Sequence, residues 1–274
     1  RVNPTVMLGR NQLIDNEVNT DYCKEHKIDI FRRKSGGGCI YADKCCIQFS
    51  YISRSVNANK AFADYMQRMA DLLKGLKIDA QLSGRNDILI DETKVSGCAF
   101  YQLSKRSVLH NSLLFDTQPD HLSNALTPAK EKLQSKGVAS VRQRVTNVST
   151  YTQLDILAFM DYVRQEMCGT KVLELTEEDM KGVAEIEKEL SSDDFVYGKN
   201  PKYSLVRKHR FEGVGTLEAH IELKNNIIGS INIVGDYFLL GDIDHDFLSL
   251  LKGCEFTREA VEERLEDIDL STII

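Results

Sequence analysis

Arg32-Arg33-Lys34-Ser35-Gly36-Gly37-Gly38 is the stretch from which the fold can be worked out. It follows a short predicted strand at 29–33 and places three consecutive glycines behind a run of basic side chains. Glycines let a backbone approach a ligand closely, their N–H groups can converge on an anion, and arginine can pair with a carboxylate or phosphate in bidentate fashion. The spacing matches neither the Walker pattern nor the dinucleotide-binding Gly-x-Gly-x-x-Gly pattern. A glycine hairpin with solvated basic residues is the alternative.

Short strands and amphipathic helices surround this loop. Apolar residues recur with helical spacing along 58–76, which predicts a helix that covers a sheet. Further helices are expected to start at Thr127-Pro128 and to span 154–167 and 177–190. The other predicted strands are 5–8, 78–82, 87–90, 95–100 and 108–115. Beyond Ser191 we expect an antiparallel meander at 207–211, 215–223 and 227–234, followed by helices near 246–251 and 258–265.

The chain of 274 residues is long enough for two domains. We predict a larger domain at 1–183 and a small C-terminal domain at 184–274. The overall net charge of −6 argues against a general nucleic-acid binder. The C-terminal stretch holds ten basic and nineteen acidic residues, whereas the first 183 residues carry a net charge of +3. An acidic solvated surface explains this difference, and so does a larger domain that handles an anion.

Seven cysteines form neither a disulfide framework nor a zinc pattern, because their number is odd and no C-x-x-C pair occurs. Free thiols in a reducing cytoplasm are therefore expected. No apolar run reaches the roughly 20 residues that a membrane-spanning helix needs, and no signal peptide is visible. The chain begins at Arg1 inside what is predicted to be a strand, so we expect further sequence upstream.

A second group of chemically informative residues follows near position 90. Ser83-Gly84-Arg85-Asn86-Asp87 offers a carboxylate for a magnesium ion or a ribose hydroxyl. Lys94 opens a strand in Lys94-Val95-Ser96-Gly97, which suits a lysine that points into a cleft, although a solvated lysine at a strand end fits the same pattern. His110 and the paired arginines Arg142 and Arg144 add candidate polar contacts, each with a purely structural alternative.

Taken in order, these motifs resemble the catalytic domain of the lipoate–protein ligase A family. Spacing and order match over about residues 5–150. The C-terminal part is similar, more loosely, to the small accessory domain of that family, through Tyr197-Gly198-x-x-Pro201, Gly235-Asp236 and Leu251-x-Gly253-Cys254. The motifs that carry the main resemblance are Gly9-Arg10-x-Gln12, Glu17-x-Asn19, Arg32 to Gly38, Asp43, Gly84 to Asp87, Lys94 to Gly97 with Ala99, and Ser140-Val141-Arg142-x-Arg144-Val145-Thr146-Asn147.

The resemblance implies an α/β fold with a mixed sheet and flanking helices, like that of biotin and lipoyl ligases, and a smaller α+β C-terminal domain. It also implies a two-step reaction. Lipoate and MgATP give lipoyl-adenylate and pyrophosphate, and a carrier lysine then attacks the adenylate. The implied carriers are the lipoyl domains of 2-oxoacid dehydrogenase E2 subunits or the glycine cleavage H protein. Neither nucleic acid nor a membrane is an expected partner.

The same resemblance implies roles for individual residues. Lys94 would be the catalytic lysine that bridges the acyl carbonyl oxygen and the phosphate. Asp87 with Asn86 would hold a magnesium ion or the nucleotide. Asp43 would be a carboxylate on the carrier side of the site or one that supports the binding residues from behind. The acyl chain would run along Val95, Ala99 and Leu113. The residues implied to bind substrate or nucleotide are Arg10, Arg33, Ser35, Gly36, Gly37, Gly38, Asp43, Arg85, Asn86, Asp87, Val95, Ser96, Gly97 and His110.

Two other activities stay open. Tyr41-Ala42-Asp43-Lys44-Cys45-Cys46 lacks the histidine and the Gly-Asn pair that the family places around this aspartate. A carrier-to-carrier lipoyl or octanoyl transferase would work without ATP through a thiolate, whose pKa nearby cations would lower. Its candidate nucleophiles are Cys39, Cys45, Cys46 and Cys98. A binding protein without turnover is the other alternative, although simple binding of an acyl chain does not require a buried ammonium.

Overall fold

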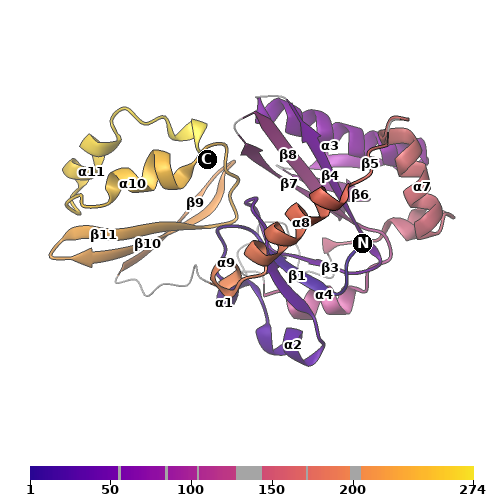
Figure 1. Cartoon of the computed structure of the whole chain (residues 1–274), viewed down its shortest axis with the longest axis horizontal. Helices are drawn as coiled ribbons and strands as arrows, with labels where there is room; N and C mark the ends of the chain where they lie inside the picture. Colours follow the sequence, from indigo (N-terminus) through magenta and orange to yellow (C-terminus); the bar gives the residue numbers. More distant parts are fainter. Residues whose placement is uncertain (55–56, 84–85, 104, 128–143, 171, 198–204) are drawn as a thin grey trace.

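The protein is described by a computed structural model that covers residues 1–54, 57–83, 86–103, 105–127, 144–170, 172–197 and 205–274. Within these ranges lie three sheets with helices packed around them, and the C-terminal sheet stands to one side of the other two (Figure 1). The predicted mixed α/β fold is therefore confirmed. Thr127 begins no helix before the described range stops, and the rest of the helix predicted there falls outside the described residues.

The largest sheet is antiparallel, with strand order β4-β8-β7-β6-β5. Its strands are β4 (Cys46–Ser53), β5 (Ala80–Ser83), β6 (Asp87–Ile90), β7 (Thr93–Leu103) and β8 (Arg106–Leu114). Helix α3 (Ala58–Gly75) covers one face, as its spacing predicted, and α7 (Ile156–Met167) packs beside it. Asn57 caps α3 by accepting a hydrogen bond from the Lys60 N–H. Tyr65, Met69 and Leu73 bury the apolar face of α3 in the main core.

A smaller mixed sheet carries the glycine loop. Strand β1 (Thr5–Leu8) pairs parallel with β2 (Asp29–Arg32) and antiparallel with β3 (Ile40–Ala42), so the glycines lie between β2 and β3. Three short helices pack around this sheet: α1 (Ile14–Glu17), α2 (Thr20–Glu25) and α4 (Pro119–Ala125). No bounds were predicted from the sequence for β3 or β4. The glycines precede β3, and the Asp43 turn separates β3 from β4.

The C-terminal unit is an antiparallel sheet of strand order β11-β10-β9 with helices on one face. Its strands are β9 (Leu205–Phe211), β10 (Gly215–Lys224) and β11 (Ile227–Gly235), close to the predicted meander. Ile221, Ile228, Leu251 and Cys254 form the core beneath its helices. Those helices are a π-helical turn (Asp244–Leu248), α10 (Ser249–Leu251), α11 (Arg258–Leu265) and a 3-10 turn (Leu270–Thr272).

The segment between the units contains a 3-10 turn (Val148–Tyr151), α7, α8 (Glu177–Leu190) and α9 (Asp193–Tyr197). Helix α8 begins with a capping box in which Thr176 and Asp179 exchange hydrogen bonds. The division predicted after Val183 stays a prediction, and α8 runs through that point. No described helix combines the length and apolar character needed to cross a membrane.

The C-terminal unit contacts the glycine loop directly. The Gly37 N–H donates to the Tyr237 carbonyl oxygen at 2.8 Å, and the Gly235 N–H donates to that of Asn11 at 2.9 Å. The Phe238 ring packs in the main core. Its centroid lies 5.9 Å from the ring centroid of Phe62 and 5.5 Å from that of Phe100. The loop predicted to bind anions therefore also joins the two units.

Candidate active site

Arg33 holds the glycine loop together from inside. Its guanidinium donates to the Ser35 hydroxyl and to the carbonyl oxygens of Met7, Gly36 and Gly38, at 2.7 to 3.2 Å. Burial lowers the pKa of Arg33 to about 10, so the side chain stays charged at neutral pH. The main role visible for this arginine is to fix the loop whose backbone borders the cavity.

Arg32 and Gly9 fix the neighbouring loop. The buried Arg32 guanidinium donates to carbonyl oxygens of Gly9, Gln12 and Val196, which ties α9 to the loop after β1. A Cβ atom at Gly9 would lie 2.0 Å from the Gly37 oxygen, so the two loops can touch only where a side chain is missing. The loop after β1 thereby supports the glycine loop.

His110 continues the network towards the cavity. Its Nε2 lies 2.7 Å from the Ser35 hydroxyl, which also accepts from Arg33 Nε. Burial, and secondly the charge of Arg33, lower the pKa of His110 to about 4. At neutral pH the imidazole is uncharged, so the Ser35 hydroxyl can donate its own proton to Nε2. His110 therefore lines the site as a neutral polar group.

This pKa shift predicts a loss of stability in acid. His110 binds a proton near pH 6.5 in the unfolded chain but near pH 4 in the folded one, so the unfolded state holds more protons between these values. The contribution of neutral His110 to the free energy of unfolding is complete above pH 6.5. It decreases by on the order of 3 kcal/mol as the pH falls towards 4. Urea unfolding of the wild type and of His110→Gln at several pH values measures it. The exposed His209→Gln is the matched control, and an equal acid slope in wild type and His110→Gln would contradict the assignment.

Lys94 and Arg144 share one buried carboxylate. Lys94 Nζ lies 2.6 Å from Asp87 Oδ1, and Arg144 Nη2 lies 2.9 Å from Asp87 Oδ2. The Asp87 side chain is 5% exposed, while the two cations are 22% and 19% exposed and border the cavity. Three charges with a net value of +1 therefore gather beside β6 and β7 of the largest sheet, where an anion can be bound.

A β-bulge and a glycine aim Lys94 at Asp87. In the pairing of β6 with β7, Ile88 faces Ser96 but Leu89 faces Lys94, so Val95 is the extra residue. Bulges of this kind redirect side chains next to active sites. Asp87 faces Gly97 across the strands, and a Cβ atom at Gly97 would lie 2.7 Å from Lys94 Nζ. The Lys94 side chain therefore passes over Gly97 to reach the Asp87 carboxylate.

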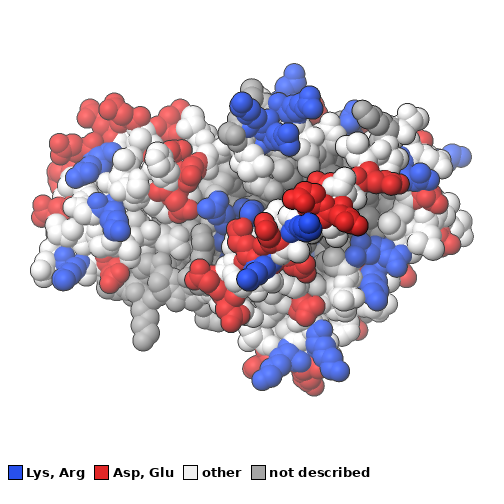
Figure 2. Space-filling view, in the orientation of Figure 1, with Lys and Arg blue, Asp and Glu red and all other residues white. Residues whose placement is uncertain are grey.

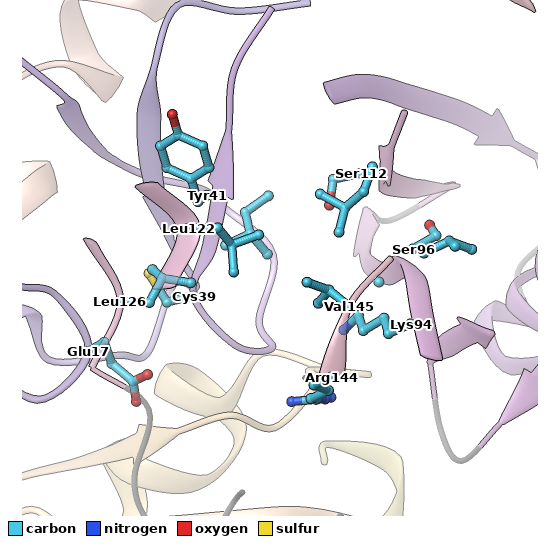
Figure 3. Close-up of a pocket in the computed structure, with 14 residues that line it drawn as sticks. Glu17, Cys39, Tyr41, Lys94, Ser96, Ser112, Leu122, Leu126, Arg144 and Val145 are labelled. Atoms are coloured by element: carbon cyan, nitrogen blue, oxygen red, sulfur yellow. The ribbon is translucent and has the colours of Figure 1, made fainter. Parts of the chain in front are cut away.

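These residues stand where two arms of a cavity meet. The first arm is mostly apolar, and Figure 3 shows Leu122 and Leu126 facing Val145 and Lys94 across it. The second arm has a more polar lining than the first and a volume of about 670 Å³. It is bordered by His110, Asn86 and the turn of the C-terminal unit at Phe211 to Gly213. This volume lies in the range of small-molecule sites. The residues that line both arms are Cys39, Ile40, Lys94, Gly97, Ser112 and Arg144.

Most of the predicted residues that the structure describes lie at this cavity. The apolar arm holds Val95 and Ser96, and the polar arm holds Arg33, Gly37, Gly38, Asn86, Asp87 and His110, while Lys94 and Gly97 belong to both. Ser35 lies behind His110, and Gly36 lies against Tyr237. Arg85 is outside the described residues.

Two predicted binding residues lie away from both arms. Arg10 forms an ion pair with Asp244 of the C-terminal unit at 3.0 Å. Asp43 turns the chain between β3 and β4, where its carboxylate accepts from the Cys45 N–H at 2.8 Å. Arg10 therefore contributes to the contact between the units and Asp43 to the turn, and their roles in binding stay predictions.

The path predicted for the acyl chain also changes. Val95 lines the apolar arm, but Leu113 is fully buried in the main core and Ala99 borders the polar arm. Successive residues of a strand point to opposite faces, so Ser112 and Leu114 face the cavity and Leu113 does not. Sequence analysis missed most of the apolar lining, which comes from β3, α4 and Val145. Arg144, expected only as a candidate polar contact, lies at the meeting of the two arms.

Most cysteines near the motifs are not activated. Burial raises the pKa of Cys46 to about 12 and that of Cys98 to about 12, and it also raises the pKa of Cys45. A raised pKa keeps the thiol protonated at neutral pH, and the thiolate is the nucleophile. Cys39 lines both arms of the cavity. All seven cysteines are free of disulfide bonds, as expected.

An apolar arm that suits an acyl chain, a polar arm that suits a nucleotide and two cations where they meet define a carboxylate-activating enzyme. Comparison with known families specifies this class. Residues 1–168 match the lipoyl protein ligase A/B catalytic domain, and residues 200–274 match the bacterial lipoate protein ligase C-terminus. The chain belongs to the lipoate–protein ligase family, which confirms the resemblance found in its sequence motifs.

Individual relatives agree with this assignment. Lipoate-protein ligase LplJ of Bacillus subtilis is 33% identical over 97% of this chain and 83% of its own length. Lipoate–protein ligase 1 of Staphylococcus aureus is 34% identical, with the same coverage of both chains. In fold alone, the chain also matches the crystal structure of P. falciparum LipL1 in complex with lipoate, with a TM-score of 0.77 at 23% identity, over 98% of this chain and 80% of that one.

Two further structures share the fold over a smaller part of the chain. A crystal structure of lipoate-protein ligase A bound with ATP has a TM-score of 0.61 at 24% identity, and it covers 72% of this chain and 83% of that one. The bipartite lipoate protein ligase of Thermoplasma acidophilum, described with its E2 lipoyl domain, has a TM-score of 0.63 at 26% identity. It covers 75% of this chain and 84% of that one.

Proposed function

We propose that this chain activates lipoate with ATP to lipoyl-adenylate and then transfers the lipoyl group to a lysine of a lipoyl carrier domain. The observation that carries the proposal is the position of Lys94 and Arg144 between an apolar and a polar arm. A lipoate chain in the first arm and ATP in the second would bring the carboxylate and the α-phosphate together beside these cations. Family membership supports the same activity.

The cations would serve both steps. A carboxylate is a poor electrophile, and its attack on phosphate brings two anions together. Preorganised N–H donors offset this repulsion as charge develops. The Lys94 ammonium would contact the acyl oxygen and the phosphate during adenylation, and then the developing oxyanion during attack by the carrier amine. Gly37 and Gly38 would shape the polar arm with their backbone, which Arg33 fixes from behind.

Magnesium is the expected companion of ATP, and the described residues form no cage for it. They contain no group of three or more His, Cys, Asp or Glu side chains placed to hold a metal. Asp87, the predicted ligand, is paired through both oxygens with Lys94 and Arg144. A magnesium ion at Asp87 would have to displace one of these partners. Binding mainly through substrate phosphates and waters is ordinary for magnesium.

The carrier should dock on the larger unit. Figure 2 shows acidic side chains gathered over α8 and over the helices of the C-terminal unit. Lipoyl domains tend to be acidic, so these surfaces would repel one. We propose an E2 lipoyl domain or a glycine cleavage H protein as the carrier, in a reducing cytoplasm that keeps the seven thiols free.

A direct assay tests the function. Purified protein with lipoate, MgATP and an apo lipoyl domain should release pyrophosphate and increase the carrier mass by one lipoyl group. Omission of the carrier should leave lipoyl-adenylate formation intact. The absence of pyrophosphate with lipoate, octanoate and other medium-chain acids would refute the proposal.

A thiol-dependent transferase is the second candidate, and the position of Cys39 at both arms favours it. This activity would move a lipoyl or octanoyl group from an acylated carrier without ATP, and Cys39→Ala would abolish it. Transfer that requires ATP and survives Cys39→Ala would exclude it. A protein that only binds would gain thermal stability with lipoate and yield product in neither assay.

A further inference from the structure

The buried carboxylate between Lys94 and Arg144 has a role that a ligand-binding assignment does not explain. Asp87 is 4% exposed, and each of its two oxygens faces one of the cations that border the cavity. An ammonium has three N–H donors and a guanidinium has five, so a cation that donates to Asp87 can also donate to other acceptors. The carboxylate can therefore hold both cations while they approach a bound anion.

The backbone fixes the carboxylate and the cations in one rigid unit. Asn86 is bonded twice to Cys98: its carbonyl oxygen accepts from the Cys98 N–H at 2.8 Å, and its side-chain amide donates to the Cys98 oxygen at 2.9 Å. The Thr146 N–H donates to the Lys94 oxygen at 2.9 Å, which places Arg144 beside the start of β7. Strand β6, strand β7 and the segment at Arg144 thus converge on Asp87.

Gly97 completes this arrangement by leaving space. Lys94 Nζ and Cε would lie 2.7 and 3.0 Å from a Cβ atom at position 97. Both of these atoms belong to the flexible end of the Lys94 side chain and not to backbone. An added methyl group would therefore displace the amine from Asp87 while disturbing the strands little.

We propose that Asp87 is a positioning residue that holds Lys94 and Arg144 side by side for the acyl-phosphate group, and that Gly97 provides the space in which Lys94 lies. The inference rests on the proposed ligase function. Asp87 itself touches neither the acyl group nor the phosphate. Its effect is exerted through the two cations, whose placement relative to the developing charge determines the rate, since a displacement of about 1 Å can cost 100-fold.

Two variants separate this role from that of a metal ligand. Asp87→Asn removes the charge that holds both cations, and Gly97→Ala displaces Lys94 without changing any charge. We expect kcat for pyrophosphate release to fall about 100-fold in Asp87→Asn and about 10-fold or more in Gly97→Ala. The KM for MgATP should not rise in Asp87→Asn, because the variant removes a negative charge from an anion-binding arm. Asp71→Asn and Gly169→Ala, at exposed positions, are the matched controls.

A second measurement follows Lys94 without using activity. Reductive methylation with ¹³C-formaldehyde gives each lysine an NMR signal, and loss of one signal in Lys94→Arg assigns that of Lys94. The signal should lie apart from those of exposed lysines in the wild type and move towards them in both Asp87→Asn and Gly97→Ala. Asp71→Asn should leave it in place.

The outcomes distinguish the inference from the function on which it rests. Wild-type rates in both variants, or an unchanged Lys94 signal, would overturn the positioning role while ligation by the wild type stands. A raised KM for MgATP and a raised magnesium requirement with unchanged kcat would make Asp87 a metal ligand instead. If the wild type releases no pyrophosphate, the proposed function is refuted. The claim that Asp87 positions Lys94 and Arg144 for catalysis is then refuted as well.

Discussion

Replacing Lys94 with alanine is expected to slow lipoyl-adenylate formation and carrier lipoylation by about 100-fold or more, because the variant removes a preorganised donor at the point where charge develops. Lys94 is placed at the meeting of the two arms, 2.6 Å from Asp87 and beside Arg144. Loss of its ammonium should affect both steps of the reaction. Single-turnover assays of pyrophosphate release and of transfer from preformed lipoyl-adenylate would measure the two effects separately.

The variant also leaves Asp87 with one fewer cationic partner, so its stability must be checked. A buried group that loses a partner costs about 1–3 kcal/mol, which thermal unfolding would show as a lower Tm. Lys94→Gln keeps an N–H donor without the charge and separates hydrogen bonding from electrostatic stabilisation. Lys74→Ala on the exposed side of α3 is the control. A folded Lys94→Ala variant with near-normal rates in both steps would rule out Lys94 as the catalytic lysine.

Local patterns in the sequence were sufficient to predict most elements. Helical spacing located α3 and α8, and runs of β-forming residues located β1, β6 and the three C-terminal strands within a few residues. These elements could be predicted because the apolar face of each helix and the extent of each strand are determined by residues that are neighbours in the sequence. No bounds were predicted for β3 or β4, which lie on either side of the Asp43 turn.

The partners of the charged side chains could not be obtained in this way. Arg10 is paired with Asp244 far along the chain, and Arg33 is bonded to carbonyl oxygens of its own and neighbouring loops. A motif shows that an arginine is present but not whether its donors face a ligand or the backbone. Lys94 and Asp87 were predicted as site residues separately. The structure shows that the pairing of β6 with β7 brings them together and that Arg144 joins them through a second ion pair with Asp87.

The contact between the two units was equally hidden from the sequence. Gly36 and Gly37 were assigned to anion binding, yet the same backbone faces Tyr237 and Phe238 of the C-terminal unit. A Cβ atom at Gly36 would lie 2.2 Å from the Tyr237 oxygen and 3.3 Å from the Phe238 Cα. Both neighbours are backbone atoms, which cannot move aside as the end of a flexible side chain can. Catalysis and the packing of the units therefore depend on one loop.

Gly36→Ala is therefore expected to lower both stability and activity. The new methyl group should displace Tyr237 from the loop and thereby break the hydrogen bond from the Gly37 N–H to the Tyr237 oxygen. Phe238 should then move away from Phe62 and Phe100. Overpacking of this kind costs about 1–3 kcal/mol. The Tm should fall by several degrees, limited proteolysis between the units should accelerate, and the rate of adenylation should fall with the displaced glycines of the polar arm.

Gly182→Ala is the matched control, since it adds the same methyl group at a position where nothing lies within 4 Å. Gly182 is inside α8, where alanine is favoured over glycine by about 1 kcal/mol, so this variant should unfold at the wild-type temperature or slightly above it. Apart from this gain in helix propensity, the two variants differ in what the methyl group meets. If Gly36→Ala matched Gly182→Ala in Tm, proteolysis and rate, Tyr237 would not rest on the glycine loop in solution, and the loop would serve the ligand alone.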